Sequence, residues 1–192
     1  MVRIGRTVTV LFLALAIPAC TPPKPTFKGS DVTGVDWGGD IALTAHTGKR
    51  VSTADYRGKI LVLFFGFTNC PDICSPTLAK LAALRKALGA DAARVQVFFV
   101  TVDPANDTPQ QLASFLPKFD PSFVGLTGTA DEVTAAAREY KVVSAPSDSS
   151  GTRFDHSGSM MVKDKAGKMR LVWRKDLSVE DMAHDIKLLG TS

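Results

Sequence analysis

Two long runs of apolar residues dominate the chain, and both are rich in β-branched and aromatic side chains. They cover Ile60–Phe67 and Val95–Val102. Continuous apolar runs of this length are typical of strands buried on both faces of a sheet. Apolar residues on either side of Thr47-Gly48 predict an early hairpin over Ile41–Val51, and a late hairpin is predicted around residues 165–168.

Helical periodicity fills the intervals between these strands. Four helices are expected, and each begins near a hydroxyl residue that suits the N-cap position: Ser75, Thr108, Thr129 and Ser178. A side-chain oxygen there accepts a hydrogen bond from a backbone N–H of the first turn. Apolar residues then recur every three or four positions, as on one buried helix face. Phe123–Leu126 is expected as a short edge strand.

The order of these elements predicts an α/β domain with a thioredoxin-like arrangement. A hairpin is followed by βαβα, one added helix and a final ββα. Strands joined by crossover helices pair in parallel, and the closing hairpin adds antiparallel strands. We therefore expect a central mixed sheet flanked by helices, with an N-terminal β-hairpin, over residues 37–192.

The first 36 residues differ from this domain in composition. Arg3 and Arg6 precede Val8–Ile17, ten uncharged and almost entirely apolar residues. The run is too short to cross a bilayer comfortably, and basic, then apolar, then small residues are the order found in a secretory signal. We expect a signal peptide over residues 1–19 and a tether rich in Pro, Gly, Ser and Thr over residues 20–36.

The end of this signal resembles the lipobox of bacterial lipoproteins. In Ile17-Pro18-Ala19-Cys20 an aliphatic residue and a small residue precede a cysteine, although proline is unusual at its position. The resemblance implies a lipidated Cys20 that anchors the domain to a membrane of the bacterial cell envelope, facing the periplasm. The alternatives are a plain cleaved signal and an uncleaved anchor.

Composition and charge exclude several classes of protein. The chain is 45% hydrophobic and 22% charged, which excludes a disordered, collagen-like or coiled-coil protein. The formal charge of +4 falls to +2 without the two arginines Arg3 and Arg6, and the sequence has no long run of lysine and arginine. We therefore expect no nucleic-acid partner.

The three cysteines bear on both compartment and chemistry. An odd number is unusual in an oxidising compartment, and lipidation of Cys20 would leave Cys70 and Cys74 as a pair. These two follow a buried strand and precede a helix, whose N-terminus stabilises a thiolate. Their spacing allows a disulfide or a metal ion between the sulfurs. A purely structural disulfide is the alternative, although so short a loop stabilises little.

A metal site would need a third ligand, and the chain has three histidines. His46 lies beside the hairpin turn and is expected to be a solvated polar residue, whereas His184 is expected on the outer surface of the last helix. His156 comes just before the late hairpin. In a thioredoxin-like fold that hairpin begins beside the cysteine loop, so His156 could approach both sulfurs. The other interpretation is an ordinary loop residue.

Three motifs together resemble the Sco/SenC family of thioredoxin-like, membrane-tethered copper proteins. They are Phe65–Cys74 (FGFTNCPDIC), Thr101–Pro104 with Asp107–Pro109, and Asp155–Ser157. The resemblance extends from about residue 37 to the end of the chain. It implies that Cys70, Cys74 and His156 bind copper, as Cu(I), Cu(II) or both. It also implies a role in assembling the binuclear copper site of cytochrome c oxidase.

Ligand chemistry agrees with copper, because two thiolates and an imidazole select it over magnesium, calcium or manganese, without excluding zinc. Asp72 and Asp155 are candidates for orienting the ligands. The favoured function is a copper metallochaperone that serves a cytochrome c oxidase subunit or another copper protein. One alternative is a thiol–disulfide oxidoreductase in which Cys70 attacks and Cys74 resolves. The other is a peroxiredoxin-like or inert structural lipoprotein.

Overall fold

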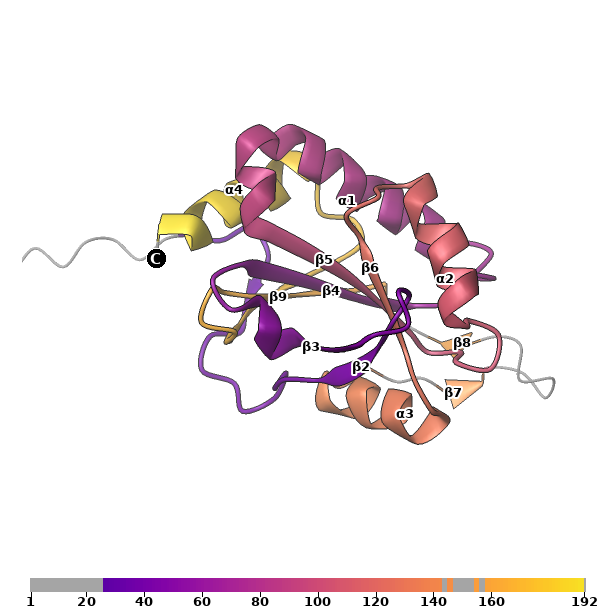
Figure 1. The fold of residues 1–192 in the computed structure, drawn as a ribbon. Coiled ribbons are helices and arrows are strands. Elements are labelled where there is room, and N and C mark those ends of the chain that lie inside the picture. The colour runs from indigo at the N-terminus through magenta and orange to yellow at the C-terminus, as the bar shows by residue number, and fades with distance from the viewer. Residues whose placement is uncertain (1–25, 143–144, 147–153, 156–157, 192) are drawn as a thin grey trace, which may run out of the picture.

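A mixed eight-stranded sheet forms the centre of the protein, in the order β1-β10-β9-β4-β5-β6-β2-β3 (Figure 1). The computed structural model describes residues 26–142, 145–146, 154–155 and 158–191. The strands are β1 (Ser30–Asp31), β2 (Ala42–Ala45), β3 (Arg50–Ser52), β4 (Ile60–Gly66), β5 (Val95–Thr101), β6 (Val124–Thr127), β9 (Met160–Lys163) and β10 (Met169–Trp173). A separate ladder pairs β7 (Ala145–Pro146) with β8 (Phe154–Asp155).

Four helices cover the two faces of the sheet, which confirms the α/β fold expected from the sequence. They are α1 (Cys74–Leu88), α2 (Pro109–Phe115), α3 (Ala130–Glu139) and α4 (Val179–Thr191), joined by the 3₁₀ helices η1 (Thr53–Tyr56), η2 (Gly89–Arg94) and η3 (Leu116–Lys118). Figure 1 shows α1, α2 and α4 on one side of the sheet and α3 on the other. The expected N-caps Thr108 and Thr129 accept hydrogen bonds from the backbone N–H groups of Gln111 and Glu132.

The two longest strands form the buried centre of the sheet. β4 and β5 pair in parallel from Ile60 opposite Val95 to Gly66 opposite Thr101, and every residue of both strands is buried. This explains their unbroken apolar sequence, because helices cover both faces. Parallel pairing also brings the carboxyl ends of β4 and β5 to the same edge of the sheet, where the two cysteines follow.

The predicted N-terminal hairpin is confirmed, and its pairing with β6 places β6 inside the sheet rather than at the edge. β2 and β3 pair across a turn in which Gly48 adopts a positive φ of 78°. β2 also pairs antiparallel with β6 through Thr44–Thr127 and Ala45–Leu126. The prediction of an edge strand near Phe123–Leu126 is therefore wrong, because a hairpin from far earlier in the chain covers that edge.

Part of the segment expected as a tether packs on the domain. β1 adds to the edge of the sheet by pairing with β10. Just before it, the backbone N–H groups of Lys28 and Gly29 donate to the carboxylate of Asp185 at 2.8 and 2.9 Å. Asp185 is fully buried on α4 and also accepts a hydrogen bond from the indole N–H of Trp173 at 2.9 Å. The described domain thus begins N-terminal to residue 37.

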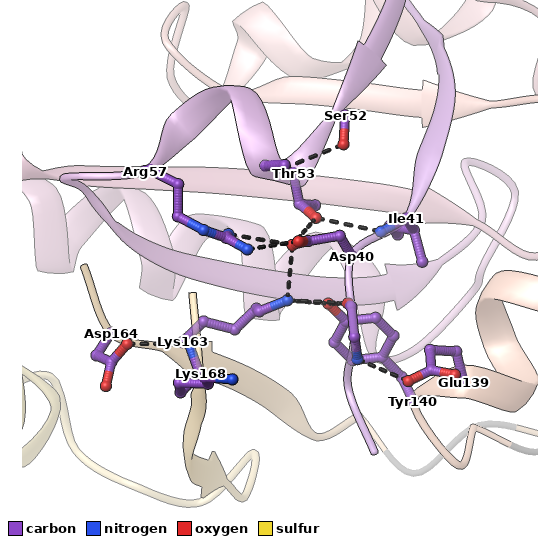
Figure 2. A network of polar contacts seen from close by, with 12 residues as sticks. Asp40, Ile41, Ser52, Thr53, Arg57, Glu139, Tyr140, Lys163, Asp164 and Lys168 are labelled. Atoms are coloured by element: carbon purple, nitrogen blue, oxygen red, sulfur yellow. Dashed lines mark hydrogen bonds and ion pairs between the residues drawn. The ribbon is translucent and has the colours of Figure 1, made fainter. Parts of the chain in front are cut away.

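A polar network fixes the segment that leads into β2 (Figure 2). The ammonium of Lys163 is buried on β9, where it donates to the Gly39 carbonyl at 2.9 Å, to Asp40 at 3.3 Å and to the Tyr140 hydroxyl at 3.2 Å. Asp40 also accepts hydrogen bonds from Arg57 and Thr53. Lys163 pairs with Leu61, at the start of β4, so the network lies toward the opposite end of the sheet from the cysteines.

Within the described ranges, no helix is long and apolar enough to cross a membrane.

Candidate metal centre

The two cysteines lie on the connection between the end of β4 and the start of α1. Cys70 closes a turn, because its backbone N–H donates to the Phe67 carbonyl at 3.2 Å, and Cys74 is the first residue of α1. Ile73 precedes the helix as its N-cap residue and provides no side-chain cap. The prediction that Ser75 caps this helix is therefore wrong.

The early start of α1 has a physical explanation. The backbone N–H of Thr77 donates to the Ile73 carbonyl at 3.0 Å, so the first helical hydrogen bond already spans both Cys74 and Ser75. Pro76 then falls within the first turn, where its missing N–H leaves no intrahelical bond unmade. As a result, the thiol of Cys74 is carried by a helix rather than by a flexible loop.

Both cysteines are thiols in the structure, and both are buried. Cys70 is 9% exposed and Cys74 is 0% exposed. Cys74 packs against Gly66, where any side chain would meet its sulfur. The residues between the two cysteines face solvent more, since Pro71 and Asp72 are exposed and Ile73 is half-buried. Of the two thiols, Cys70 is thus the more accessible.

The two thiols differ in acidity. Burial alone would raise the pKa of Cys70, but hydrogen bonds from the backbone N–H of Ile73 and from the Cys74 thiol outweigh it and lower that pKa. For Cys74, burial dominates and raises the pKa well above its ordinary value, and a negative charge on Cys70 would raise it further. Cys70 is thus the sulfur that becomes a thiolate first, as expected beside a helix N-terminus.

The third predicted ligand, His156, lies outside the described residues, as does the predicted lipidation site Cys20. The chain just beyond His156 is described. A β-carbon on Gly158 would lie 2.8 Å from Cγ2 of Ile73 and 3.6 Å from Cβ of Lys175. Gly158 therefore packs directly on the residue that separates Asp72 from Cys74, two positions after His156.

The other two histidines contact residues outside the cysteine loop, which are Gly125 for His46 and Asp185 for His184. The Nδ1 of His46 accepts a hydrogen bond from the backbone N–H of Gly125 at 3.0 Å, so this half-buried side chain extends the pairing of β2 with β6. It is thus held by the sheet rather than freely solvated as predicted. His184 is exposed on α4, as predicted. Within the described part of the chain, no three His, Cys, Asp or Glu side chains form a group that could hold a metal.

One buried acid beside the cysteine loop was not predicted as a functional residue. Asp107 is 0% exposed and accepts hydrogen bonds from the hydroxyls of Thr68 at 2.5 Å and Thr101 at 2.7 Å. The backbone N–H of Thr68 also donates to this carboxylate at 3.0 Å. Burial raises the pKa of Asp107, and these hydrogen bonds oppose the shift. The only sequence signal was its place in the Asp107–Pro109 motif.

Two aspartates, Asp72 and Asp155, are predicted to orient the metal ligands, and the described residues give no contact that tests this role. Asp72 is exposed. Burial is the largest influence on the pKa of Cys70 and raises it, whereas hydrogen bonds from Ile73, Cys74 and the backbone N–H of Asp72 lower it. The carboxylate of Asp72 is not among these influences. The side chain of Asp155 is outside the described part of the structure. The orienting role stays a prediction for both residues.

A cavity of about 580 Å³ lies elsewhere, at the end of the sheet away from the thiols. Its charged walls are largely neutralised, because Arg57 pairs with Asp40 and Arg170 pairs with Asp164. This cavity does not include either thiol among its lining residues. Two thiols of unequal acidity, one on a turn and one at the start of the helix that follows, can bind a soft metal ion or close to a disulfide.

The comparisons with known proteins agree on one family. The model of the SCO1/SenC family matches residues 31–190. Protein sco1 of Schizosaccharomyces pombe is 36% identical over 155 residues, which cover 78% of this chain and 59% of that protein. The chain spans about half the length of several curated relatives that it matches.

Solved structures give the same result for the fold. The copper-bound structure of ScoI from Bradyrhizobium japonicum has a TM-score of 0.73 and 31% identity, covering 80% of this chain and 99% of that one. BsSco, described as having a disulfide switch and as a member of the Sco family of cytochrome c oxidase assembly proteins, has a TM-score of 0.69 and 26% identity. The match covers 81% of this chain and 94% of BsSco.

Proposed function

The chain belongs to the SCO1/SenC family, and from this premise we propose that it is a copper metallochaperone. Cys70, Cys74 and His156 would bind one copper ion as Cu(I), Cu(II) or both. The recipient would be the copper-site subunit of cytochrome c oxidase or another copper protein. The observation that carries this proposal is the pair of buried thiols at the junction of β4 and α1.

The donor chemistry of this junction fits copper. Soft thiolates favour copper, zinc and iron–sulfur clusters over the hard cations, and an imidazole suits copper as well. The lowered pKa of Cys70 supports the role, because a metal binds the thiolate rather than the thiol. Copper-bound structures of relatives such as ScoI of Bradyrhizobium japonicum support the choice of metal.

The position of Gly158 supports His156 as the third ligand. Gly158 contacts Ile73, which lies between the two cysteines, and only Ser157 separates it from His156. Two residues of extended chain span about 7 Å at most. A position this close in sequence supports the proposal that the imidazole of His156 would reach the two sulfurs and add a nitrogen donor to them.

A second candidate function is reduction of disulfides in a copper-site protein. The unequal pKa values of the two thiols favour it, because thiol–disulfide exchange uses one reactive thiolate and one resolving thiol. Cys70 would attack the substrate disulfide, and Cys74 would then displace the substrate and close the disulfide within this chain. The disulfide switch described for BsSco supports such chemistry in a relative.

Membrane attachment is part of the proposal. Residues 1–19 would be removed as a signal peptide, Cys20 would carry the lipid, and the first part of the predicted tether over residues 20–36 would connect it to a copper-binding domain that faces the periplasm. The fixed part of this connection begins at Lys28, since its backbone N–H is held by Asp185. The length of chain left to act as a free link is then shorter than the composition alone suggested.

The decisive experiment measures copper in reduced and oxidised protein. Reduced protein loaded with excess Cu(II) or Cu(I) and then desalted should retain one copper per chain. The Cu(II) form should show a sulfur-to-copper charge-transfer absorption. Protein first oxidised to the Cys70–Cys74 disulfide should retain none, since both thiolate ligands are lost. Stoichiometric copper in the disulfide form would contradict the proposal, and so would its absence from the reduced form.

A further inference from the structure

Asp107 is a buried carboxylate surrounded by neutral hydrogen-bond donors. Its partners are the backbone N–H of Thr68 and the hydroxyls of Thr68 and Thr101. Among the ion pairs of the described residues, none involves Asp107. A charge placed in the interior without a cation is costly, so the hydrogen bonds from Thr68 and Thr101 must compensate for its lost hydration.

The carboxylate joins the carboxyl ends of the two central strands. Thr101 is the last residue of β5, and Thr68 follows the end of β4 by two residues. A backbone hydrogen bond also joins the two strand ends, because the N–H of Val102 donates to the Gly66 carbonyl at 2.9 Å. Asp107 is itself held by its backbone N–H, which donates to the Asp103 carbonyl at 2.9 Å. Its position is therefore fixed from both directions.

The same contacts fix the turn that presents Cys70. That turn runs from Phe67 to Cys70, and Thr68 is its second residue. Two hydrogen bonds from Thr68 to one carboxylate leave its backbone little freedom. A shift of Asp107 would therefore move Thr68, which is only two residues before Cys70 in the same turn.

The charge of Asp107 also lies near both cysteines. Its partner Thr68 stands two residues after Gly66, against which the sulfur of Cys74 packs, and two residues before Cys70. The field of a buried anion extends farther than that of an exposed one, because the interior screens it poorly. An ion held by the two sulfurs would lie in the same field.

We propose that Asp107 is a positioning residue of the copper site, which fixes the Cys70 turn through Thr68 and whose charge favours Cu(II) over Cu(I). This inference rests on the proposed function. Two thiolates with Cu(I) carry a net charge of −1, whereas the same ligands with Cu(II) are neutral. A neighbouring carboxylate therefore destabilises the Cu(I) form relative to the Cu(II) form. Neutralising it should raise the Cu(II)/Cu(I) reduction potential.

The test uses Asp107→Asn, which keeps the shape of the side chain and one carbonyl acceptor but removes the charge. Cu(II) affinity should fall by about tenfold, the lower end of what loss of an outer-sphere partner causes, while Cu(I) affinity stays within about twofold. The affinities are measured by competition with chelators specific for each oxidation state. Asp185→Asn is the matched control, because Asp185 is as deeply buried but contacts Trp173, Lys28, Gly29 and the imidazole of His184 instead of the cysteine loop.

A second measurement needs no copper. In the metal-free, reduced protein, amide hydrogen exchange of Thr68 should be slow and should become at least tenfold faster in Asp107→Ala. Thr68→Val, which keeps the backbone N–H, should give a smaller increase. If Asp107→Ala does not fold, Asp107→Asn and Thr68→Val provide the comparison.

The outcomes separate this inference from the proposed function. An unchanged ratio of Cu(II) to Cu(I) affinity in Asp107→Asn would overturn the role of the charge, while copper binding itself remained. Unchanged exchange at Thr68 would overturn the positioning role. If the unaltered protein bound no copper in either state, the proposed function would fail first. Fast exchange in Asp107→Ala would then still support the fixing of the turn.

Discussion

A β-carbon placed on Gly66 would lie 2.6 Å from the sulfur of Cys74, so the last residue of β4 must lack a side chain for this thiol to occupy its position. The same β-carbon would lie 2.9 Å from the ring of Phe99 on β5. Both neighbours are buried and belong to regular elements, which leaves little room for adjustment. Gly66 therefore connects the packing of the central sheet to the geometry of the cysteine pair.

Replacing Gly66 with alanine should accordingly damage both stability and copper binding. Overpacking of a buried site costs about 1–3 kcal/mol, and we expect Gly66→Ala to lower the free energy of unfolding by that amount. Displacement of the Cys74 sulfur should also weaken copper binding by tenfold or more. Chemical denaturation and copper competition measure the two effects. Gly190→Ala is the control, because a β-carbon there meets nothing within 4 Å; equal behaviour of the two variants would disprove this reasoning.

Several features of the fold could be predicted because their signals are local. The hairpin turn at Gly48 and the helix caps at Thr108 and Thr129 each depend on a few neighbouring residues, and the structure confirms all three. The apolar sequence of β4 and β5 likewise predicted their burial, because a strand covered on both faces has no polar side.

The features that were missed depend on residues far apart in the sequence. Asp185 holds Gly29 across 156 positions, and Asp107 holds Thr68 across 39. Nothing near either residue indicates such a partner. The position of β6 inside the sheet likewise depends on β2, from much earlier in the chain. Cys70 and Cys74 could be proposed as a pair from the sequence only because they lie four positions apart.

The two cysteines should react at different rates with an alkylating reagent. Because the pKa of Cys70 is lowered and that of Cys74 is raised, a larger fraction of Cys70 is thiolate at any pH below 9. Iodoacetamide should modify Cys70 first, and its rate should rise at lower pH than for an ordinary cysteine. Mass spectrometry of time-quenched samples from pH 5 to 9 assigns each product. Cys70→Ser should leave Cys74 slow throughout the series; faster labelling of Cys74 than of Cys70 would refute the assignment.

The polar network around Asp40 in Figure 2 predicts how the free energy of unfolding depends on pH. Burial alone would raise the pKa of Asp40, but hydrogen bonds from Arg57 and Thr53 and the charge of Lys163 lower it from 3.8 to about 2. A carboxyl with a depressed pKa in the folded state stabilises the fold above its unfolded pKa, and the stabilisation is lost as the pH falls through the folded value. The contribution of Asp40 should therefore be complete above about pH 4 and gone below about pH 2.

Asp40→Asn isolates this contribution. At pH 7 the variant removes the carboxylate that pairs with the buried ammonium of Lys163, and we expect a loss of about 1–2 kcal/mol in unfolding free energy. This is less than for a fully buried pair because Asp40 is partly exposed. Urea denaturation should show the difference narrowing as the pH is lowered toward 2. The double variant Asp40→Asn, Lys163→Met should be less destabilised than the sum of the single variants; simple additivity would argue against their coupling.

Cys20→Ala should separate membrane attachment from copper binding. Without the thiol no lipid can be added, so the protein should either remain unprocessed or appear in the aqueous fraction after detergent phase separation. The described fold begins at residue 26, and Cys70 and Cys74 lie far beyond it, so the purified variant should bind copper as the unaltered protein does. Intact-mass measurement of the mature protein provides the check. An unmodified Cys20 at the mature N-terminus, or cleavage elsewhere, would rule out the lipoprotein proposal.

His156→Ala distinguishes a copper chaperone from a disulfide reductase. If His156 is a ligand, its loss leaves two thiolates. Cu(I) accepts such low coordination, so its binding should weaken but persist, whereas Cu(II) favours additional nitrogen donors and should be bound far more weakly. Thiol–disulfide exchange depends on the acidity and access of Cys70, which the start of α1 largely sets, so reactivity toward a small disulfide should change little. His184→Ala is the control, because His184 is exposed on α4. Absorption spectra of the Cu(II) form, exchange rates, and oxidase activity in cells lacking the unaltered protein provide the three measurements. An unchanged Cu(II) spectrum together with normal oxidase activity would make His156 an ordinary loop residue and would favour the reductase.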